Sequence, residues 1–206
     1  IVPMFGRHDE RGKLTQQGAV RFFQVRENPT GIYNTLMARA AQLGTFEYES
    51  IRVKDDRGNY VEKLLPIAYN YHNPNKRIIV IVDHMRGLKR EQGFKMKENI
   101  DKMSEYFTDL RNLTGMTIVG TIHSSRAISD VNRLKLMRDK LYLTDDDVKD
   151  SGNPVEDANV LFTMLNASDE KYGIKNHFGY MVEAYSGRYR CLSIVRARNA
   201  ACPQHL

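Results

Sequence analysis

The stretch RIIVIV at residues 77–82 decides the fold. Five of its six residues are Ile or Val, and the polar segments NPNK and DH stand on either side of it. Continuous β-branched runs of this length are typical of strands that are covered on both faces, as in a parallel sheet. We therefore expect a buried strand at residues 77–82.

A helix and a second strand follow this run. Between residues 95 and 113, apolar side chains recur at helical spacing with charged residues between them, which predicts an amphipathic helix. Residues 116–122 (MTIVGTI) then form a second apolar run. A strand, a helix and a strand with short connections predict a right-handed parallel crossover, whose two strands end at the same edge of the sheet. Ligands of open α/β sheets bind at that edge.

The first third of the chain predicts further α/β elements. A β-branched and aromatic run at residues 19–25 predicts a strand, and the turn sequence NPTG precedes a helix predicted from about residue 32 to 43. Two apolar runs flank the polar sequence DDRGN, which predicts a surface hairpin or a polar loop inserted at residues 45–76. Residues 1–18 receive no firm assignment.

The last third of the chain predicts two helices and three strands. A basic helix is expected at residues 128–141, and the sequence NPVE at residues 153–156 predicts a helix start with its Asn as the N-cap. Residues 160–165 (VLFTML) predict another buried strand. Two strands at residues 180–185 and 189–195 are expected to close the chain as an antiparallel pair.

Composition favours one ordinary domain, or a domain and a half. The 206 residues are 41% hydrophobic, which is enough for a core, and carry a net charge of +6, which favours a polyanionic partner. No stretch approaches the roughly 20 consecutive apolar residues of a membrane span, so we expect a soluble protein without a membrane partner. The two cysteines suggest neither a disulfide framework nor a zinc site, which fits a reducing, intracellular setting.

Three polar residues follow the two predicted strands of the crossover. Asp83 ends the first strand, where a carboxylate can hold a hydrated Mg²⁺ ion at the edge of the sheet. His84 comes next, and either polarises a water molecule or lines the edge. His123 follows the second strand and could hydrogen-bond a terminal phosphate. The alternatives are that Asp83 caps a strand or turn and that His123 is a solvated loop residue.

Two arginines stand at the end of the last predicted strand. Arg196 and Arg198 are separated by one residue, so strand alternation sends both to one face, where they could clamp a phosphate. The alternative is that they are charged residues of an edge strand, where they disfavour pairing with another chain. No complete phosphate-cradling loop is present, because Gly6–Lys13 has one residue too many between its glycines and is followed by Leu14 instead of Ser or Thr.

From about residue 19 to the end, the chain resembles the RecA-like ATPase domain of DnaB-type replicative helicases, in a phage-like form. The resemblance rests on an ordered set of motifs. They are NPTGIYNTLMARAAQL at 28–43, RIIVIVDH at 77–84, the segment 117–126, DVKDSG at 147–152, EDAN at 156–159 and RARN at 196–199. It implies an α/β, RecA-like P-loop NTPase core with a mostly parallel sheet flanked by helices, incomplete at the N-terminus. Residues 77–206 would run from the Walker B strand to the arginine finger.

The resemblance also implies roles for individual residues. Asp83 would bind Mg²⁺ through water, beside His84 at the ATP site, and His123 would sense the γ-phosphate where the family usually has Gln. Arg198, with Arg196 beside it, would reach the ATP of an adjacent subunit as an arginine finger. A channel loop would contact the backbone of single-stranded DNA. The residues expected to bind DNA are Arg126, Lys149, Asp150, Ser151 and Gly152.

The function that the resemblance implies is that of a hexameric, ATP-dependent helicase that translocates on single-stranded DNA and unwinds duplex. A primase or a helicase loader would be a further partner, in the cytoplasm of a bacterial or phage-infected cell. Because the Walker A loop and the catalytic Glu lie upstream of the matched region in the family, we expect a fragment cut at both ends that is inactive in isolation. The alternatives are a natural remnant acting as a non-catalytic nucleic-acid-binding or oligomerisation module, and a recombinase or loader ATPase.

Overall fold

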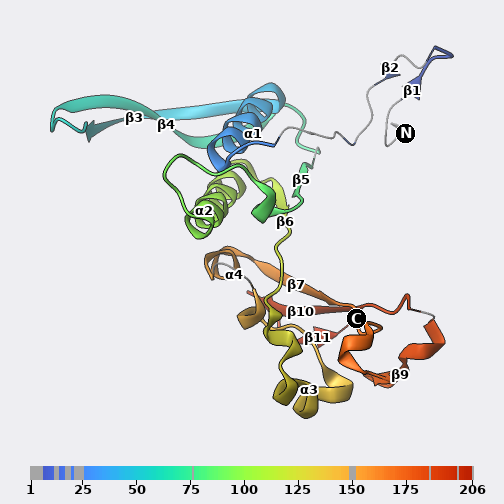
Figure 1. The fold of residues 1–206 in the computed structure, drawn as a ribbon. Coiled ribbons are helices and arrows are strands. Elements are labelled where there is room, and N and C mark those ends of the chain that lie inside the picture. Colours follow the sequence, from blue (N-terminus) through green and yellow to red (C-terminus); the bar gives the residue numbers. More distant parts are fainter. Residues whose placement is uncertain are drawn as a thin grey trace.

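The computed structural model describes residues 7–11, 14–16, 20, 26–75, 77–148, 152–185, 187–198 and 200–205. The strand predicted at residues 19–25 lies outside these ranges except for Val20. The helices are α1 (Pro29–Leu43), α2 (Met96–Thr114), α3 (Val131–Met137) and α4 (Asn153–Asp157). The strands are β1 (Arg7–His8), β2 (Leu14–Gln16), β3 (Gly44–Lys54), β4 (Tyr60–Tyr71), β5 (Ile79–Val82), β6 (Thr117–Gly120), β7 (Val160–Leu165), β8 (Asn176–His177), β9 (Tyr180–Met181), β10 (Cys191–Ala197) and β11 (Gln204–His205). Figure 1 shows how these elements are arranged.

The predicted crossover is confirmed in its central features. Strands β5 and β6 pair in parallel, from Ile79 opposite Thr117 to Val82 opposite Gly120, and α2 connects them. The helix buries Ile100 and Met103 against Met85, which follows β5. The C-cap of the helix is Gly115, whose φ of 67° is left-handed. Glycine is favoured in this conformation because it has no Cβ atom. Because β5 and β6 are parallel and in register, both strands end at the same edge.

The mostly parallel sheet is not what the structure shows. Among the described residues, the strands form five small sheets, and β5 with β6 is the one parallel pair. The expected burial of residues 77–82 on both faces is also wrong, because Ile79 and Ile81 are 65% and 68% exposed. The apolar composition identified the strand, but no described element covers its second face. The fold is mixed α/β.

The predicted helix and hairpin are both present, but α1 begins at Pro29, three residues before the predicted start near residue 32. Asn28 caps the helix, and its side chain accepts a hydrogen bond from the backbone N–H of Gly31 at 2.8 Å. The N-terminus of α1 is also held by Glu91, whose carboxylate accepts the Thr30 N–H at 2.8 Å. These hydrogen bonds from Thr30 hold the pKa of the Glu91 carboxyl below its ordinary value. Strands β3 and β4 then form a long antiparallel hairpin.

The strand pairing of the C-terminal half differs from the prediction. The predicted pair at residues 180–185 and 189–195 is wrong, since β10 pairs in antiparallel fashion with β7 and β11. Residues Val182–Tyr185 form a 3-10 turn because Val182 turns inward and is buried in the core of this half. Strand β7 was predicted to be buried on both faces, but alternate residues, including Phe162 and Met164, are exposed.

Two helix predictions in this half need smaller corrections. The basic helix predicted at residues 128–141 is shorter, because α3 covers Val131–Met137 and 3-10 turns flank it at Arg126–Ser129 and Arg138–Lys140. The N-cap of α4 is Gly152 and not Asn153, so the helix begins at Asn153, one residue earlier than the predicted N-cap implied. The capping pattern located the helix, but not its first residue.

Candidate functional site at the end of the parallel strands

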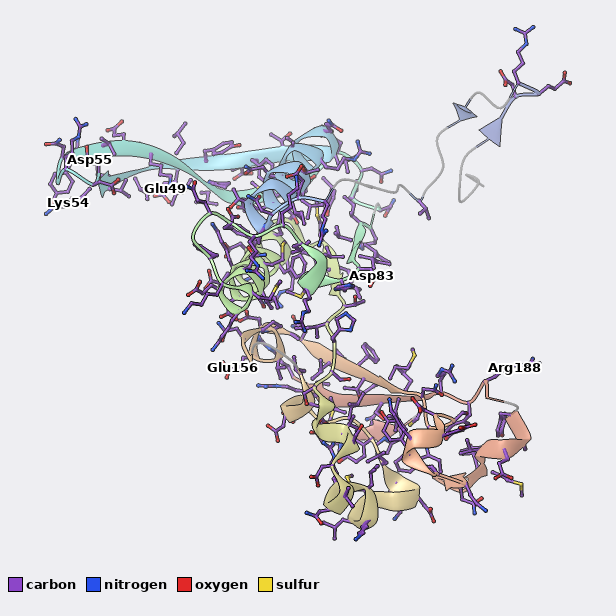
Figure 2. The ribbon with its side chains drawn as sticks, in the orientation of Figure 1. Glu49, Lys54, Asp55, Asp83, Glu156 and Arg188 are labelled. Atoms are coloured by element: carbon purple, nitrogen blue, oxygen red, sulfur yellow. The ribbon has the colours of Figure 1, made fainter. Side chains whose placement is uncertain are left out.

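The edge where β5 and β6 end brings a carboxylate and a hydroxyl together. Asp83 follows β5 directly, and Thr121 follows β6. The Thr121 Oγ1 donates a hydrogen bond to Asp83 Oδ1 at 2.6 Å. Backbone bonds hold the same edge, since the Thr121 N–H donates to the Val82 carbonyl at 3.0 Å. Asp83 is exposed, as its labelled side chain in Figure 2 shows, so its second carboxylate oxygen is open to a ligand.

Two imidazoles stand next to this carboxylate. The rings of His84 and His123 meet edge to face, with their centroids 4.5 Å apart. The Nδ1 of His84 is buried and has no hydrogen-bond partner among the described residues, whereas His123 is exposed. The predicted convergence of Asp83, His84 and His123 at one edge therefore occurs in the structure.

Close packing behind the edge fixes the position of these side chains. Gly120 is the last residue of β6, and a Cβ placed there would lie 3.0 Å from Phe107 Cε2 and 3.1 Å from Met85 Sδ. The Met85 N–H donates to the Thr121 carbonyl at 2.9 Å, which ties the turn after β5 to the end of β6. A larger residue at position 120 would therefore push Met85 and the neighbouring His84 away from Thr121.

The donor set fits a hydrated Mg²⁺ ion better than a metal held by protein groups alone. The described residues contain no cluster of three or more His, Cys, Asp or Glu side chains that could hold a metal ion. Mg²⁺ usually keeps several waters and uses one or two carboxylates together with substrate phosphates. A single exposed carboxylate, held in place through one oxygen by Thr121, meets that requirement.

The two arginines lie on a different sheet from Asp83. Arg196 is on β10 opposite Leu161 of β7, and Arg198 comes just after the strand. The Arg198 guanidinium donates to the carbonyl of Glu156 in α4 at 3.3 Å, and its backbone N–H donates to the Asn159 carbonyl at 3.0 Å. Within one chain Arg198 thus borders α4. The expected contact of the two arginines with ATP requires a second copy.

The expected DNA-binding loop is only partly described. Lys149, Asp150 and Ser151 lie outside the described residues, and Gly152 is the N-cap of α4. Arg126 begins the 3-10 turn Arg126–Ser129, and the structure does not describe its side chain.

Helix α2 contacts the α4 segment, which Arg198 also contacts. Ser104 on α2 donates to Asp157 Oδ2 of α4 at 2.6 Å. Arg111, also on α2, donates to the Asp157 carbonyl at 3.0 Å and to the side chain of Asn159. Arg198 contacts the same short segment, and α2 also packs Ile100 and Met103 against Met85 beside the strand edge, so α2 lies between that edge and the segment that Arg198 contacts.

Sequence reasoning did not single out Thr121, and it gave Asp147 no role of its own. Thr121 lies near the end of the predicted second strand, so its place beside Asp83 in a parallel pair was the available signal. Asp147 belongs to the DVKDSG motif, but it is buried and accepts two hydrogen bonds from Arg133, at 2.6 and 2.7 Å. It also accepts the Thr144 N–H at 2.7 Å, so its role is to anchor the start of the loop.

The arrangement of the described elements allows a comparison with solved structures. The fold is similar to that of a DnaB-like replicative helicase. The similarity has a TM-score of 0.52 at 14% sequence identity and covers 90% of this chain and 33% of the helicase chain. That helicase was described together with its interactions with primase. This chain therefore spans about a third of the length of its structural neighbour, and the likeness shows the fold.

Other comparisons give no assignment. No protein-family model matches the chain, and no curated protein matches it by sequence. Among the described residues, no helix is both long and apolar enough to cross a membrane.

Proposed function

We propose that this chain is part of an ATP-dependent replicative DNA helicase that assembles as a ring and translocates on single-stranded DNA. The observation that carries the proposal is the edge of the parallel pair, where Asp83, Thr121, His84 and His123 meet. This edge is where α/β sheets bind their ligands. The similarity to a DnaB-like helicase supports the same choice among the many functions of α/β folds.

In this proposal, each polar group at the edge has a role toward ATP. Asp83 would hold Mg²⁺ through water, and Thr121 would keep the Asp83 carboxylate in position. When bound, the metal ion neutralises charge on the phosphates. His123 is exposed beside His84 and would donate a hydrogen bond to the terminal phosphate.

Arg198 and Arg196 would complete the site from a neighbouring subunit. A guanidinium supplied by a second protein stabilises the charge of the transferring phosphoryl group. Since Arg198 borders the α4 segment that α2 holds, a change at one nucleotide site could move the loop before α4. That loop carries Lys149, Asp150, Ser151 and Gly152, which we propose as contacts to the DNA backbone, together with Arg126.

The proposal is tested by ATP turnover in the full-length protein, with and without single-stranded DNA. We expect Asp83→Ala to lower turnover at least about a hundredfold and Arg198→Ala about a thousandfold. Mixing the two variants should restore activity, because some interfaces then pair an intact Asp83 with an intact Arg198. Asp83→Asn should unfold at the wild-type temperature, which separates loss of chemistry from loss of fold.

Two outcomes would contradict the proposal. Full activity of Arg198→Ala would exclude the contribution in trans, and full activity of Asp83→Ala would exclude the ATP site. Binding of single-stranded DNA by a full-length protein without ATP turnover would favour a non-catalytic binding module.

A further inference from the structure

The segment at residues 156–159, which joins α4 to β7, holds Arg198 from one side. The Arg198 backbone N–H donates to the Asn159 carbonyl at 3.0 Å, directly beyond the last pair of β10 with β7. The Arg198 guanidinium donates to the carbonyl of Glu156, which Figure 2 labels, at 3.3 Å. Because the Arg198 side chain is exposed, the position of its guanidinium depends on where this carbonyl lies.

Helix α2 holds the same segment from the other side. Arg111 Nη1 donates to the Asp157 carbonyl at 3.0 Å and also to the side chain of Asn159. Ser104, which is 4% exposed, donates to Asp157 Oδ2 at 2.6 Å. Asn159 therefore contacts both arginines, with its side chain toward Arg111 and its carbonyl toward Arg198.

The segment needs these contacts because α4 is too short to keep its shape alone. The helix has five residues, of which Val155 is the buried one. Isolated helices shorter than about 12 residues are marginal in water. Helix α2 has 19 residues and buries Ile100, Met103 and Leu110. The long helix therefore determines where the short one lies, and the carbonyl groups at the end of α4 determine where Arg198 lies.

The position of Arg198 matters for the proposed chemistry. A guanidinium that acts on the ATP of a neighbouring subunit stabilises the charge of the transferring phosphoryl group. A displacement of about 1 Å at such a site can lower the rate about a hundredfold. An arginine side chain also has many rotamers, so contacts that restrict it before ATP arrives reduce the entropy lost in the transition state.

We infer that Arg111 is a positioning residue for Arg198, and that it acts through Asn159 and the end of α4. The inference rests on the proposed function for the role of Arg198 toward the ATP of a neighbouring subunit. Arg111 does not itself touch ATP. It serves the nucleotide site of the neighbour and not the site that contains Asp83 of its own chain.

The first test is ATP turnover of the full-length protein with Arg111→Met, which keeps an apolar side chain but removes the guanidinium. We expect kcat to fall about tenfold at an unchanged KM for ATP, because the lost contact acts on the transition state. Lys97→Met is the matched control. It removes one positive charge from an exposed position of α2 and should turn over ATP as the wild type does.

Asn159→Ala removes the same contact from the other side. It keeps the carbonyl that accepts from Arg198, so a similar fall in kcat would come from the lost contact with Arg111. The double variant of Arg111→Met and Asn159→Ala should turn over ATP as slowly as the slower single variant, because both changes remove one interaction. Multiplied losses in the double variant, or full activity of Arg111→Met, would overturn the inference.

Mixed assemblies separate the positioning of Arg198 from a general loss of structure. Arg111→Met mixed with Asp83→Ala should exceed the sum of the separate activities, because some interfaces then pair an intact ATP site with a well-placed Arg198. Arg111→Met mixed with Arg198→Ala should show no gain, because both defects lie on the same side of the interface. A gain in the second mixture would overturn the inference. So would no gain in the first mixture when Asp83→Ala and Arg198→Ala complement each other.

Hydrogen–deuterium exchange of the full chain tests the contact without ATP. In Arg111→Met, the amides of residues 156–159 and of Arg198 should exchange at least about fivefold faster, while those of β5 and β6 should exchange as in the wild type. Unchanged exchange at Arg198 would overturn the inference. Faster exchange there would support the contact even if Asp83→Ala and Arg198→Ala failed to complement each other. The positioning contact and the proposed function can therefore fail independently.

Discussion

Aspartate and histidine side chains at the edge of β5 and β6 and in the C-terminal half of this chain are placed in opposite ways. At the edge of β5 and β6, Asp83 and His123 are exposed, and one hydrogen bond from Thr121 holds the carboxylate. In the C-terminal half, Asp147 is 2% exposed and His177 is fully buried, and both have several hydrogen-bond partners. A buried polar group must be paired, so its contacts explain its presence. An exposed carboxylate at a strand end has no such need of a partner within the fold, so it is available for a ligand.

Asp147 shows how a buried carboxylate stabilises the C-terminal half. Burial alone raises the pKa of the Asp147 carboxyl, but the hydrogen bonds from Arg133 and Thr144 outweigh that effect and hold the pKa below its ordinary value. The carboxylate therefore stays charged at neutral pH. It joins α3 to the turn before the proposed DNA loop.

His177 is the corresponding imidazole. Its Nε2 lies 2.6 Å from the Leu141 carbonyl, which can only accept, so Nε2 carries the proton. In the neutral ring, Nδ1 then accepts from the Tyr189 hydroxyl at 3.1 Å. Burial lowers the pKa of His177, because a charged ring would lose its hydration. The neutral form is the one that the fold stabilises.

The largest expected effect in this comparison is the removal of the buried carboxylate. Asp147→Ala leaves the Arg133 guanidinium without its partner, and the free energy of unfolding should fall by about 3 to 5 kcal/mol. Urea denaturation monitored by circular dichroism measures the change. Asp146→Ala is the matched control, since it removes the same charge from the exposed neighbour and should change stability by less than about 0.5 kcal/mol. Equal losses in the two variants would mean that burial does not distinguish them.

A smaller effect is expected when the exposed carboxylate loses its hydrogen-bond donor. Thr121→Val should raise the Mg²⁺ concentration for half-maximal ATP turnover of the full-length protein about tenfold, or ~1.4 kcal/mol, because Asp83 loses its orientation. Thr121→Ser keeps the hydroxyl and should restore the wild-type value. An unchanged Mg²⁺ requirement in Thr121→Val would show that Thr121 does not position Asp83. Thermal unfolding of both variants reports separately on the fold.

The smallest effect concerns pH. Because the folded-state pKa of His177 lies below its unfolded value of about 6.5, the unfolded chain binds more protons just below that pH. The free energy of unfolding should therefore fall as pH drops from about 7 through 6.5 toward the folded-state pKa. His177→Gln should reduce the slope of the unfolding free energy against pH, by an amount that corresponds to at most one bound proton. His205, whose pKa burial also lowers, adds to the same slope in both proteins. If His177→Gln kept the wild-type slope, His177 would not be the cause of the pH dependence of stability.

The sequence predicted the elements whose signals are local. The apolar run at residues 77–82, the helical periodicity at 95–113 and the polar turn DDRGN each depend on neighbours in the chain, and each element is present. The polar residues at the ends of β5 and β6 could be predicted as well. Parallel pairing across a helix brings those two strand ends together by geometry alone.

Strand partners and burial in this chain were decided by the tertiary structure. Residues 180–185 have the composition of a strand, but Val182 turns into the core that Leu165 and Cys191 share, so β10 pairs with β7 instead. Asp147 and Asp146 are alike in sequence, yet only Asp147 lies where Arg133 reaches it. Local sequence fixes dihedral preference and periodicity. Which groups are desolvated, and by what, depends on contacts between residues distant in the chain.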